Sequence, residues 1–222
     1  MNTPVIIKTD DGSDTLFVRE LGENYHSTFG AVQESMHVFI NAGLRHAGQS
    51  VLTLFEVGFG TGLNAWLTLL ETIKTGQYIR YITVEKYPLE LELVKKLNYP
   101  SFLPDGDPSH FQMIHEATWN IEVSITDHFS ILKLASDLKN VDYSNLPMFN
   151  LIFFDAFSPD KQPELWETSI LRKISDHCAQ GAKIVTYCAK GAVRRSLIEA
   201  GFVAERIAGP PGKREMLRGT KD

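Results

Sequence analysis

Short apolar runs alternate with segments of helical spacing along most of the chain, and this alternation predicts the order of the secondary-structure elements. Residues 51–57 and 78–84 are nearly continuous apolar runs, which is typical of strands buried on both faces. Each run is followed by a segment that is predicted to be a helix, residues 63–72 after the first run and residues 89–97 after the second. The order strand, helix, strand, helix implies a parallel sheet with right-handed crossovers.

Prolines interrupt this pattern between residues 98 and 150. Three short apolar segments in that stretch are each compatible with a strand, namely residues 111–114, 121–125 and 129–134. Regular order resumes with two further strand–helix pairs, predicted at 149–154 with 163–178 and at 183–188 with 191–200. The last two predicted strands, 203–207 and 215–218, are joined by a short loop, so we expect the final strand to run antiparallel to the others.

The N-terminal residues have a different pattern from the rest. Residues 5–19 alternate weakly around a turn at residues 10–13, which predicts a small hairpin, and the apolar positions across residues 30–47 have helical spacing. We therefore predict an N-terminal extension, residues 1–48, followed by one compact α/β unit, residues 49–222. This unit is expected to hold a Rossmann-like, mostly parallel sheet of seven strands that ends in an antiparallel hairpin.

Charge and cysteine content restrict the class of protein. The 222 residues carry a formal net charge of −5, which disfavours a protein held to nucleic acid by charge alone but leaves room for a local basic patch. The two cysteines, Cys178 and Cys188, have the spacing of neither a disulfide framework nor a zinc site. Residues 1–10 lack the pattern of a signal peptide, and no apolar run is long enough to span a membrane. We therefore expect a cytoplasmic protein with no metal and no membrane partner.

Three glycines follow the first buried strand and open the first predicted helix. Gly58, Gly60 and Gly62 have the spacing GxGxG, whereas a dinucleotide fingerprint needs GxGxxG and a phosphate-binding P-loop needs a Gly-Lys-Ser/Thr end. The observed spacing suits the methionine part of S-adenosylmethionine lying over the turn, with Glu56 placed to reach its ammonium group. The alternative is a tight strand-to-helix turn that binds no ligand.

Two further acids are candidates for cofactor contacts. Glu85 ends the second strand, where nucleotide-binding α/β folds place an acid that accepts hydrogen bonds from both ribose hydroxyls, although a solvated glutamate at a strand end is the alternative. Asp137 follows the segment 129–134 and is a candidate to accept from the adenine amino group. An equally good interpretation is that Asp137 caps a helix that starts near Leu138.

The loop after the strand at residues 149–154 carries the candidate chemistry for group transfer. In open α/β sheets, ligands bind at the carboxyl ends of the strands, so this loop faces the reacting group. Asp155 can accept a hydrogen bond from an amine, and the ring of Phe157 can contact a cationic methyl donor. The alternative for Phe157 is a loop aromatic that is tucked into the core.

Three segments together resemble a known family. Residues 155–166 read Asp-Ala-Phe-Ser-Pro-Asp-Lys-Gln-Pro-Glu-Leu-Trp, the glycine loop is followed by Asn64, and residues 213–217 read Lys-Arg-Glu-Met-Leu. This chain resembles, over about residues 15–218, the bacterial tRNA 5-methylaminomethyl-2-thiouridine methyltransferases of the MnmC/MnmD type. The resemblance implies a class I S-adenosylmethionine-dependent methyltransferase fold and methylation of the 5-aminomethyl group of a wobble 2-thiouridine in tRNA.

The same resemblance implies roles for individual residues. Asp155 would orient and deprotonate the amine and also contact the cofactor, Phe157 and Tyr25 would wall the pocket or stack on the base, and Asn64 would join the cofactor-binding residues. S-adenosylmethionine would be the cofactor without a flavin, because this chain resembles the stand-alone methyltransferase form, and a separate flavin-dependent oxidase is a candidate partner that acts upstream.

Six basic residues are candidates for a phosphate-binding surface around the mouth of the site: Lys161, Arg194, Arg195, Lys213, Arg214 and Arg218. Each is individually as compatible with a solvated surface charge. Two alternatives to tRNA methylation stay open. One is an S-adenosylmethionine-dependent N-methyltransferase that acts on a small-molecule or protein amine, and the other is a non-catalytic binding module on the same fold.

Overall fold

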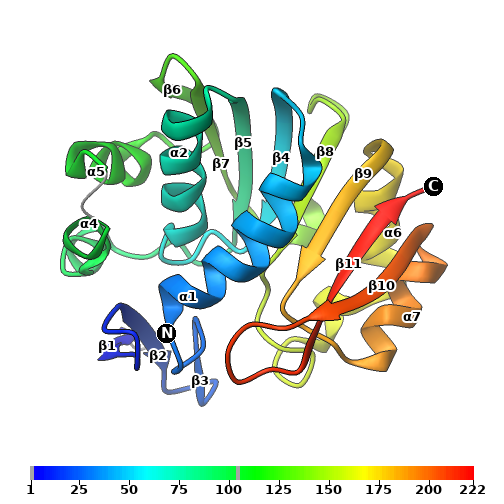
Figure 1. The fold of residues 1–222 in the computed structure, drawn as a ribbon, viewed down its shortest axis with the longest axis horizontal. Coiled ribbons are helices and arrows are strands. Elements are labelled where there is room, and N and C mark those ends of the chain that lie inside the picture. The colour runs from blue at the N-terminus through cyan, green and yellow to red at the C-terminus, as the bar shows by residue number, and fades with distance from the viewer. Residues whose placement is uncertain (1–2, 104–105) are drawn as a thin grey trace.

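An eight-stranded sheet lies between two layers of helices (Figure 1). The computed structural model describes residues 3–103 and 106–222, so the first two residues of the predicted extension lie outside the described part. The strand order is β10-β11-β9-β8-β4-β5-β7-β6. The strand bounds are β4 Val51–Val57, β5 Tyr78–Glu85, β6 Glu122–Thr126, β7 Phe129–Ala135, β8 Phe149–Phe154, β9 Cys178–Thr186, β10 Phe202–Ala208 and β11 Glu215–Lys221.

The five strands from β9 to β7 in this order are mutually parallel, and the C-terminal hairpin reverses direction as predicted. β11 lies between β9 and β10 and is antiparallel to both. The predicted number of seven strands is wrong, because β6 adds an eighth at the edge, antiparallel to β7. The α/β class and the mostly parallel plan are confirmed.

Residues 111–114 were expected to be compatible with a strand, and this expectation is wrong. They belong to the helix α5, Pro108–Glu116. Asp107 caps this helix by accepting from the amide of Ser109, and Pro108 occupies its first turn. Phe111 and Ile114 are three residues apart and both buried, so the apolar pair that resembled a strand is one face of a helix.

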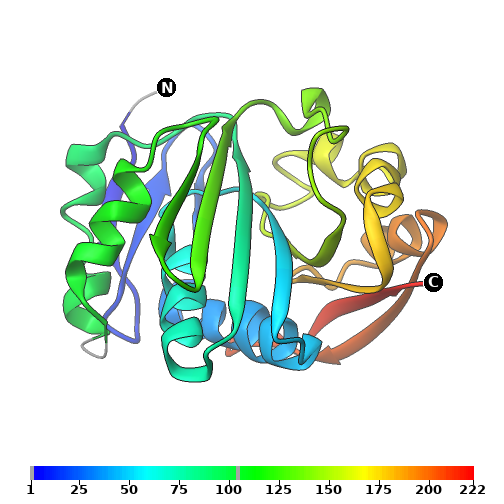
Figure 2. The ribbon, with the colours of Figure 1, turned by 90° about the horizontal axis from the view of Figure 1, so that it is seen from above.

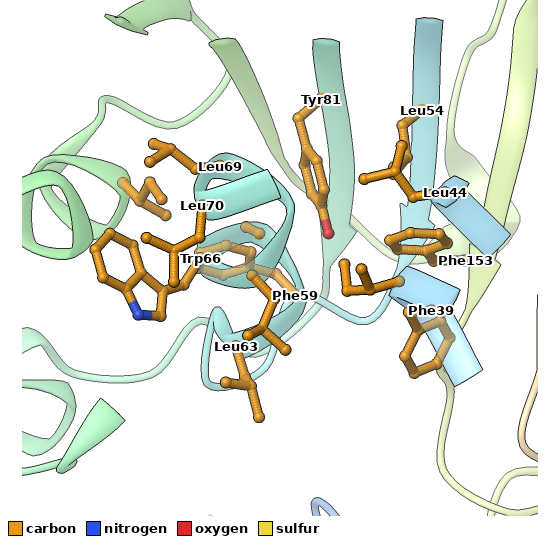
Figure 3. Packing of buried hydrophobic residues seen from close by; sticks show 14 of the residues in the cluster. Phe39, Leu44, Leu54, Phe59, Leu63, Trp66, Leu69, Leu70, Tyr81 and Phe153 are labelled. Carbon is orange, nitrogen blue, oxygen red and sulfur yellow. The ribbon is translucent and has the colours of Figure 1, made fainter. Parts of the chain in front are cut away.

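Helices cover both faces of the sheet and divide its core into two clusters. On one face, α2 (Leu63–Thr75) and η1 (Met36–Arg45) pack residues such as Trp66 and Phe39 against the strands (Figure 3). On the other face lie α6 (Thr168–Asp176) and α7 (Gly191–Glu199). The remaining helices are short: α1 Ala31–Ser35, α3 Leu91–Val94, α4 Tyr99–Phe102, η2 Leu138–Asn140 and η3 Pro163–Trp166. No helix within the described residues has the length and apolar character to cross a membrane.

Two predicted helices are shorter in the structure. The segment 163–178 begins as the 3-10 helix η3 and continues as α6, and β9 already begins at Cys178. The segment 89–97 holds only one helical turn, α3.

The N-terminal residues form the predicted hairpin and helix and pack into the same core as the sheet. β1 (Val5–Lys8) and β2 (Asp14–Val18) are antiparallel, a third short strand β3 (Glu23–Asn24) follows, and the helix continues from α1 into η1 with π-helical winding. Figure 2 shows these strands beside the helices of residues 91–116. Asp14 and Asn98 join the two parts through reciprocal backbone-to-side-chain hydrogen bonds of 2.8 and 2.9 Å. The division into residues 1–48 and 49–222 stays a prediction.

Lys133 is a buried cation on β7, and only 1% of its surface is exposed. Its Nζ donates to the carbonyl oxygen of His115 at 2.6 Å and lies 4.8 Å from the centre of the Trp119 ring. Burial lowers the pKa of Lys133 to about 8, since an ammonium group loses its hydration there. The stability of the fold must therefore depend on pH above neutrality.

We expect Lys133→Met to remove a rise in folding stability at alkaline pH. Because the pKa of Lys133 is lower in the folded chain, the unfolded chain binds more protons between about pH 8 and about pH 10, so stability rises with pH there. The rise should be about 3 kcal/mol, because lowering a pKa by one corresponds to about 1.4 kcal/mol. Denaturant unfolding of both proteins at the two ends of this range measures it. An equal rise in the variant would contradict the assignment to Lys133.

Candidate functional site

The turn from β4 to α2 holds the three predicted glycines in backbone conformations that other residues rarely adopt. Gly58, Gly60 and Gly62 have φ angles of 87°, 48° and 70°. The amide of Gly58 donates to the carbonyl oxygen of Val84 at 3.0 Å, which fixes the turn to the end of β5. A Cβ atom at position 58 would lie 2.8 Å from the carbonyl oxygen of Asp155. The glycine turn therefore lies directly against the residue that follows β8.

Two aromatic rings, both predicted to wall the pocket, lie beside this turn. A Cβ atom at Gly60 would be 2.9 Å from the ring of Tyr25, and the ring centroids of Tyr25 and Phe157 are 5.1 Å apart, edge to face. Burial, and then the charge of Glu85, raise the pKa of Tyr25 above its ordinary value, so the phenol keeps its proton. Phe157 is half-buried against Tyr25, so the N-terminal extension and the loop after β8 together form one wall.

The carboxylate of Glu85 binds the other side of the turn. Its Oε2 accepts from the amide of Gly60 at 3.0 Å, and its Oε1 accepts from the amide of Tyr87 at 2.8 Å. The structure therefore places Glu85 at the strand end and against the glycine turn. Its contact with a ribose stays a prediction.

Asp137 caps a short helix, as one of its two interpretations required. Its carboxylate accepts from the amide of Lys139 at 3.0 Å, at the start of η2. An ion pair of 2.8 Å with Lys86 lowers the pKa of Asp137. The capping interpretation is confirmed, and the contact with adenine stays a prediction.

Beneath the turn, Asn64 connects two carboxyl groups. Its Nδ2 donates to Oε1 of Glu56 at 3.1 Å and to Oδ2 of Asp155 at 2.8 Å. The hydroxyl of Thr83 donates to Oε2 of Glu56 at 2.8 Å. Glu56 is fully buried, and burial raises its pKa to about 8. Because both oxygens of Glu56 already have partners, its predicted contact with a ligand ammonium stays a prediction.

Asp155 is a carboxyl group that titrates near neutrality. Burial raises its pKa to about 7, and the charge of Glu34 contributes in the same direction, whereas the hydrogen bond from Asn64 and the charge of Lys213 lower it. A carboxyl group with a pKa near neutrality can accept and release a proton at ordinary pH, which suits a general base. Asp155 is therefore suited to acid–base chemistry near neutral pH.

Sequence reasoning did not assign this charge balance to Glu34 and Tyr187, and it gave Lys213 only a role in phosphate binding. Lys213 donates to Oε1 of Glu34 at 2.6 Å, and its Nζ lies 4.0 Å from the centre of the Tyr187 ring. The hydroxyl of Tyr187 donates to the carbonyl oxygen of Ala156 at 2.9 Å. Glu34 occupied a polar position of a predicted helix, and nothing in that pattern signalled that its side chain is buried.

The six basic residues that were candidates for phosphate binding have different surroundings. Three of them have partners inside the protein: Lys213 pairs with Glu34, Arg218 pairs with Glu205 at 2.9 Å, and Arg194 donates to the carbonyl oxygen of Ala204 at 3.2 Å. The other three, Lys161, Arg195 and Arg214, are exposed. Their predicted contacts with RNA stay predictions.

Comparison with known families gives a match over the second half of the chain. Residues 107–222 match a family described as S-adenosyl-L-methionine-dependent methyltransferase. The chain is also 30% identical, over 216 residues, to the tRNA 5-methylaminomethyl-2-thiouridine biosynthesis bifunctional protein MnmC of Ectopseudomonas mendocina, covering 90% of this chain and 32% of that protein. The MnmC protein of Aromatoleum aromaticum is 31% identical, over 95% of this chain and 34% of its own length. This chain thus spans about a third of the length of these curated relatives.

Among solved structures, MnmC2 from Aquifex aeolicus is similar over nearly the whole chain. The match has a TM-score of 0.80 and 26% sequence identity and covers 99% of this chain and 70% of that one. DesVI from Streptomyces venezuelae matches with a TM-score of 0.50 and 11% identity, over 86% of this chain and 92% of its own, which indicates a shared fold alone.

Proposed function

Since the chain belongs to the S-adenosyl-L-methionine-dependent methyltransferases, we propose that it methylates the nitrogen of an aminomethyl group on a 2-thiouridine of tRNA. The observation that carries this proposal is the position of Asp155, whose backbone lies against the glycine turn and whose carboxyl group accepts from Asn64 of the following helix. Burial raises the pKa of this carboxyl group to about 7. A methyltransferase that acts on an amine needs such a group, because most primary amines are protonated at neutral pH and a protonated amine has no lone pair for attack.

The residues around the turn fit S-adenosylmethionine. The positive φ angles of Gly58, Gly60 and Gly62 leave the loop without side chains, so that a ligand can approach its backbone. Oδ1 of Asn64 is buried and has no hydrogen-bond partner among the described residues, so it is free to accept from a bound ligand. We propose that these residues, together with Glu85, hold the cofactor, which supplies a methyl group on a positively charged sulfur.

The residues of the chain then orient and deprotonate the acceptor. The nitrogen lone pair forms a bond to the methyl carbon while the carbon–sulfur bond breaks, and the amine loses one proton. We propose that Asp155 orients the amine and takes up this proton, while Tyr25 and Phe157 restrict the acceptor to one approach. Both aromatic rings are also suitable for stacking on a nucleobase.

The likeness to the MnmC proteins and to MnmC2 supports tRNA as the acceptor. In this proposal the exposed cations Lys161, Arg195 and Arg214 contact phosphates, and a separate flavin-dependent oxidase generates the aminomethyl substrate. We further propose that the enzyme works in the cytoplasm, where tRNA is modified, and uses neither flavin nor metal.

Transfer of labelled methyl groups from S-adenosylmethionine to tRNA tests the proposal. The tRNA is taken from cells that lack this modification step, and the labelled nucleosides are separated after digestion. We expect the label in 5-methylaminomethyl-2-thiouridine, with none after the tRNA is treated with ribonuclease before the reaction. Cofactor binding without label in RNA, but with label in small-molecule or protein amines, would overturn tRNA as the substrate and leave a methyltransferase of another specificity.

A further inference from the structure

The side-chain amide of Asn64 lies between the carboxyl groups of Asp155 and Glu56 and donates a hydrogen bond to each. Asn64 is the second residue of α2 and lies two positions after the left-handed backbone of Gly62, so the start of the helix fixes where its side chain points. Its single NH₂ group donates one hydrogen to Asp155 and the other to Glu56. An amide is planar, and its two N–H bonds therefore hold both carboxyl groups in one defined arrangement.

We propose that Asn64 is a positioning residue for methyl transfer, whose amide fixes the orientation of Asp155 and couples it to Glu56. The inference rests on the proposed role of Asp155 in the proposed function. It adds a coupling between the partly buried Asp155 and the fully buried Glu56.

Electrostatics support this coupling. Glu56 is fully buried and Asp155 is partly buried, and the charge of Asp155 raises the pKa of Glu56, after burial as the larger cause. Two nearby carboxyl groups in a poorly solvated site cannot both ionise cheaply, so the pair releases its protons in two separate steps. Burial raises the pKa of both groups, and the hydrogen bond from Asn64 opposes that rise in each, so one amide acts on the ionisation of both carboxyl groups.

Other charged and titratable groups surround the pair and belong to different elements. Tyr81 of β5 lies beside Glu56, and Figure 3 shows its hydroxyl pointing toward the end of the cluster that holds Phe59. Three groups face Asp155 from elsewhere: Glu34 of α1, Lys213 of the loop between β10 and β11, and Tyr187 after β9. The charge of Glu34 raises the pKa of Asp155, and the charge of Lys213 lowers it. The amide of Asn64 differs from these groups because it donates to both Asp155 and Glu56.

The test follows the carboxyl carbon of Asp155 by nuclear magnetic resonance during a pH titration of the ¹³C-aspartate-labelled protein without substrate. The signal is assigned by its loss in Asp155→Asn. Asn64→Leu keeps the branched shape of the side chain but has no donor, so we expect the Asp155 midpoint to rise by about one pH unit. Asn64→Ser perturbs the fold less and keeps one donor, and it should shift the midpoint in the same direction by a smaller amount.

Thr83→Val is the matched control, because it removes the other hydrogen bond to Glu56 and leaves Asp155 untouched. It should leave the Asp155 midpoint within a few tenths of a pH unit of the native value. The acid limb of the pH–kcat/KM profile, which reports the free enzyme, should move with the titration midpoint in both Asn64 variants, while the Kd for S-adenosylmethionine changes less than kcat does.

An unchanged Asp155 midpoint in both Asn64 variants would overturn the inference, and so would a loss of S-adenosylmethionine affinity that accounts for the whole loss of kcat/KM. The titration needs no methyl acceptor. A failure of tRNA methylation would therefore refute the proposed function without affecting the measured coupling, and the two failures are distinguishable.

Discussion

Asp155→Asn is expected to reduce kcat for methyl transfer by about 10²–10⁴-fold, which is the usual contribution of a general base. The substitution keeps the size of the side chain and its contact with Asn64, but the amide cannot take up a proton at neutral pH. Binding of S-adenosylmethionine should change far less than kcat, because the backbone N–H of residue 155 still donates to the carbonyl oxygen of Val57 and holds the loop. Single-turnover kinetics and calorimetric binding on the same protein separate these two effects.

Asp160→Asn provides the control for this experiment. Asp160 lies in the same loop, but its side chain is largely exposed and pairs with Lys190. Its substitution should leave kcat within about two-fold of the native value, since exposed ion pairs contribute little. Equal losses of kcat in both variants would mean that the loop as a whole matters, and would contradict the assignment of the general base to Asp155.

Gly58→Ala is expected to lower folding stability by about 2–4 kcal/mol and kcat by about 100-fold. The φ angle of 87° strains any residue with a side chain, and the added Cβ would lie 2.8 Å from the backbone carbonyl oxygen of Asp155. This contact cannot be relieved by rotating a side chain, so the strand end that carries the base has to move. Thermal unfolding and steady-state kinetics measure the two effects.

Gly76→Ala separates backbone strain from the steric contact. Gly76 ends α2 with a similar φ angle of 71°, yet a Cβ atom there would have no neighbour within 4 Å. It should lose only about 1 kcal/mol of stability and no activity. If both alanine variants retained full activity, the contact between the glycine turn and Asp155 would not matter for function.

The parts of the fold that could be predicted are those that the local pattern determines. Apolar runs such as 51–57 are strands because both faces of the sheet are covered, and strand, helix and hairpin order followed from them. Phe111 and Ile114 could not be assigned, since a run of four residues fits a strand and a helix turn equally well. The deciding signal was the cap at Asp107, outside the apolar run.

The site could be predicted where its residues adjoin strand ends. Gly58 and Asp155 each follow a strand at the same edge of the sheet, so topology alone brings them together. Glu34 and Lys213 could not be found in this way, because they meet only through the packing of α1 against the loop between β10 and β11. The coupling of Asn64 to two carboxyl groups likewise depends on rotamers that no sequence pattern encodes.

The ion pair between Glu34 and Lys213 joins residues that are 179 positions apart. During synthesis Glu34 therefore leaves the ribosome long before Lys213. Contacts of such long sequence separation form late, because the loop they close costs much chain entropy. A nascent chain can therefore complete β4, β5 and the glycine turn well before the charge balance around Asp155 exists. The charge balance around Asp155 is therefore complete only after Lys213 has been synthesised.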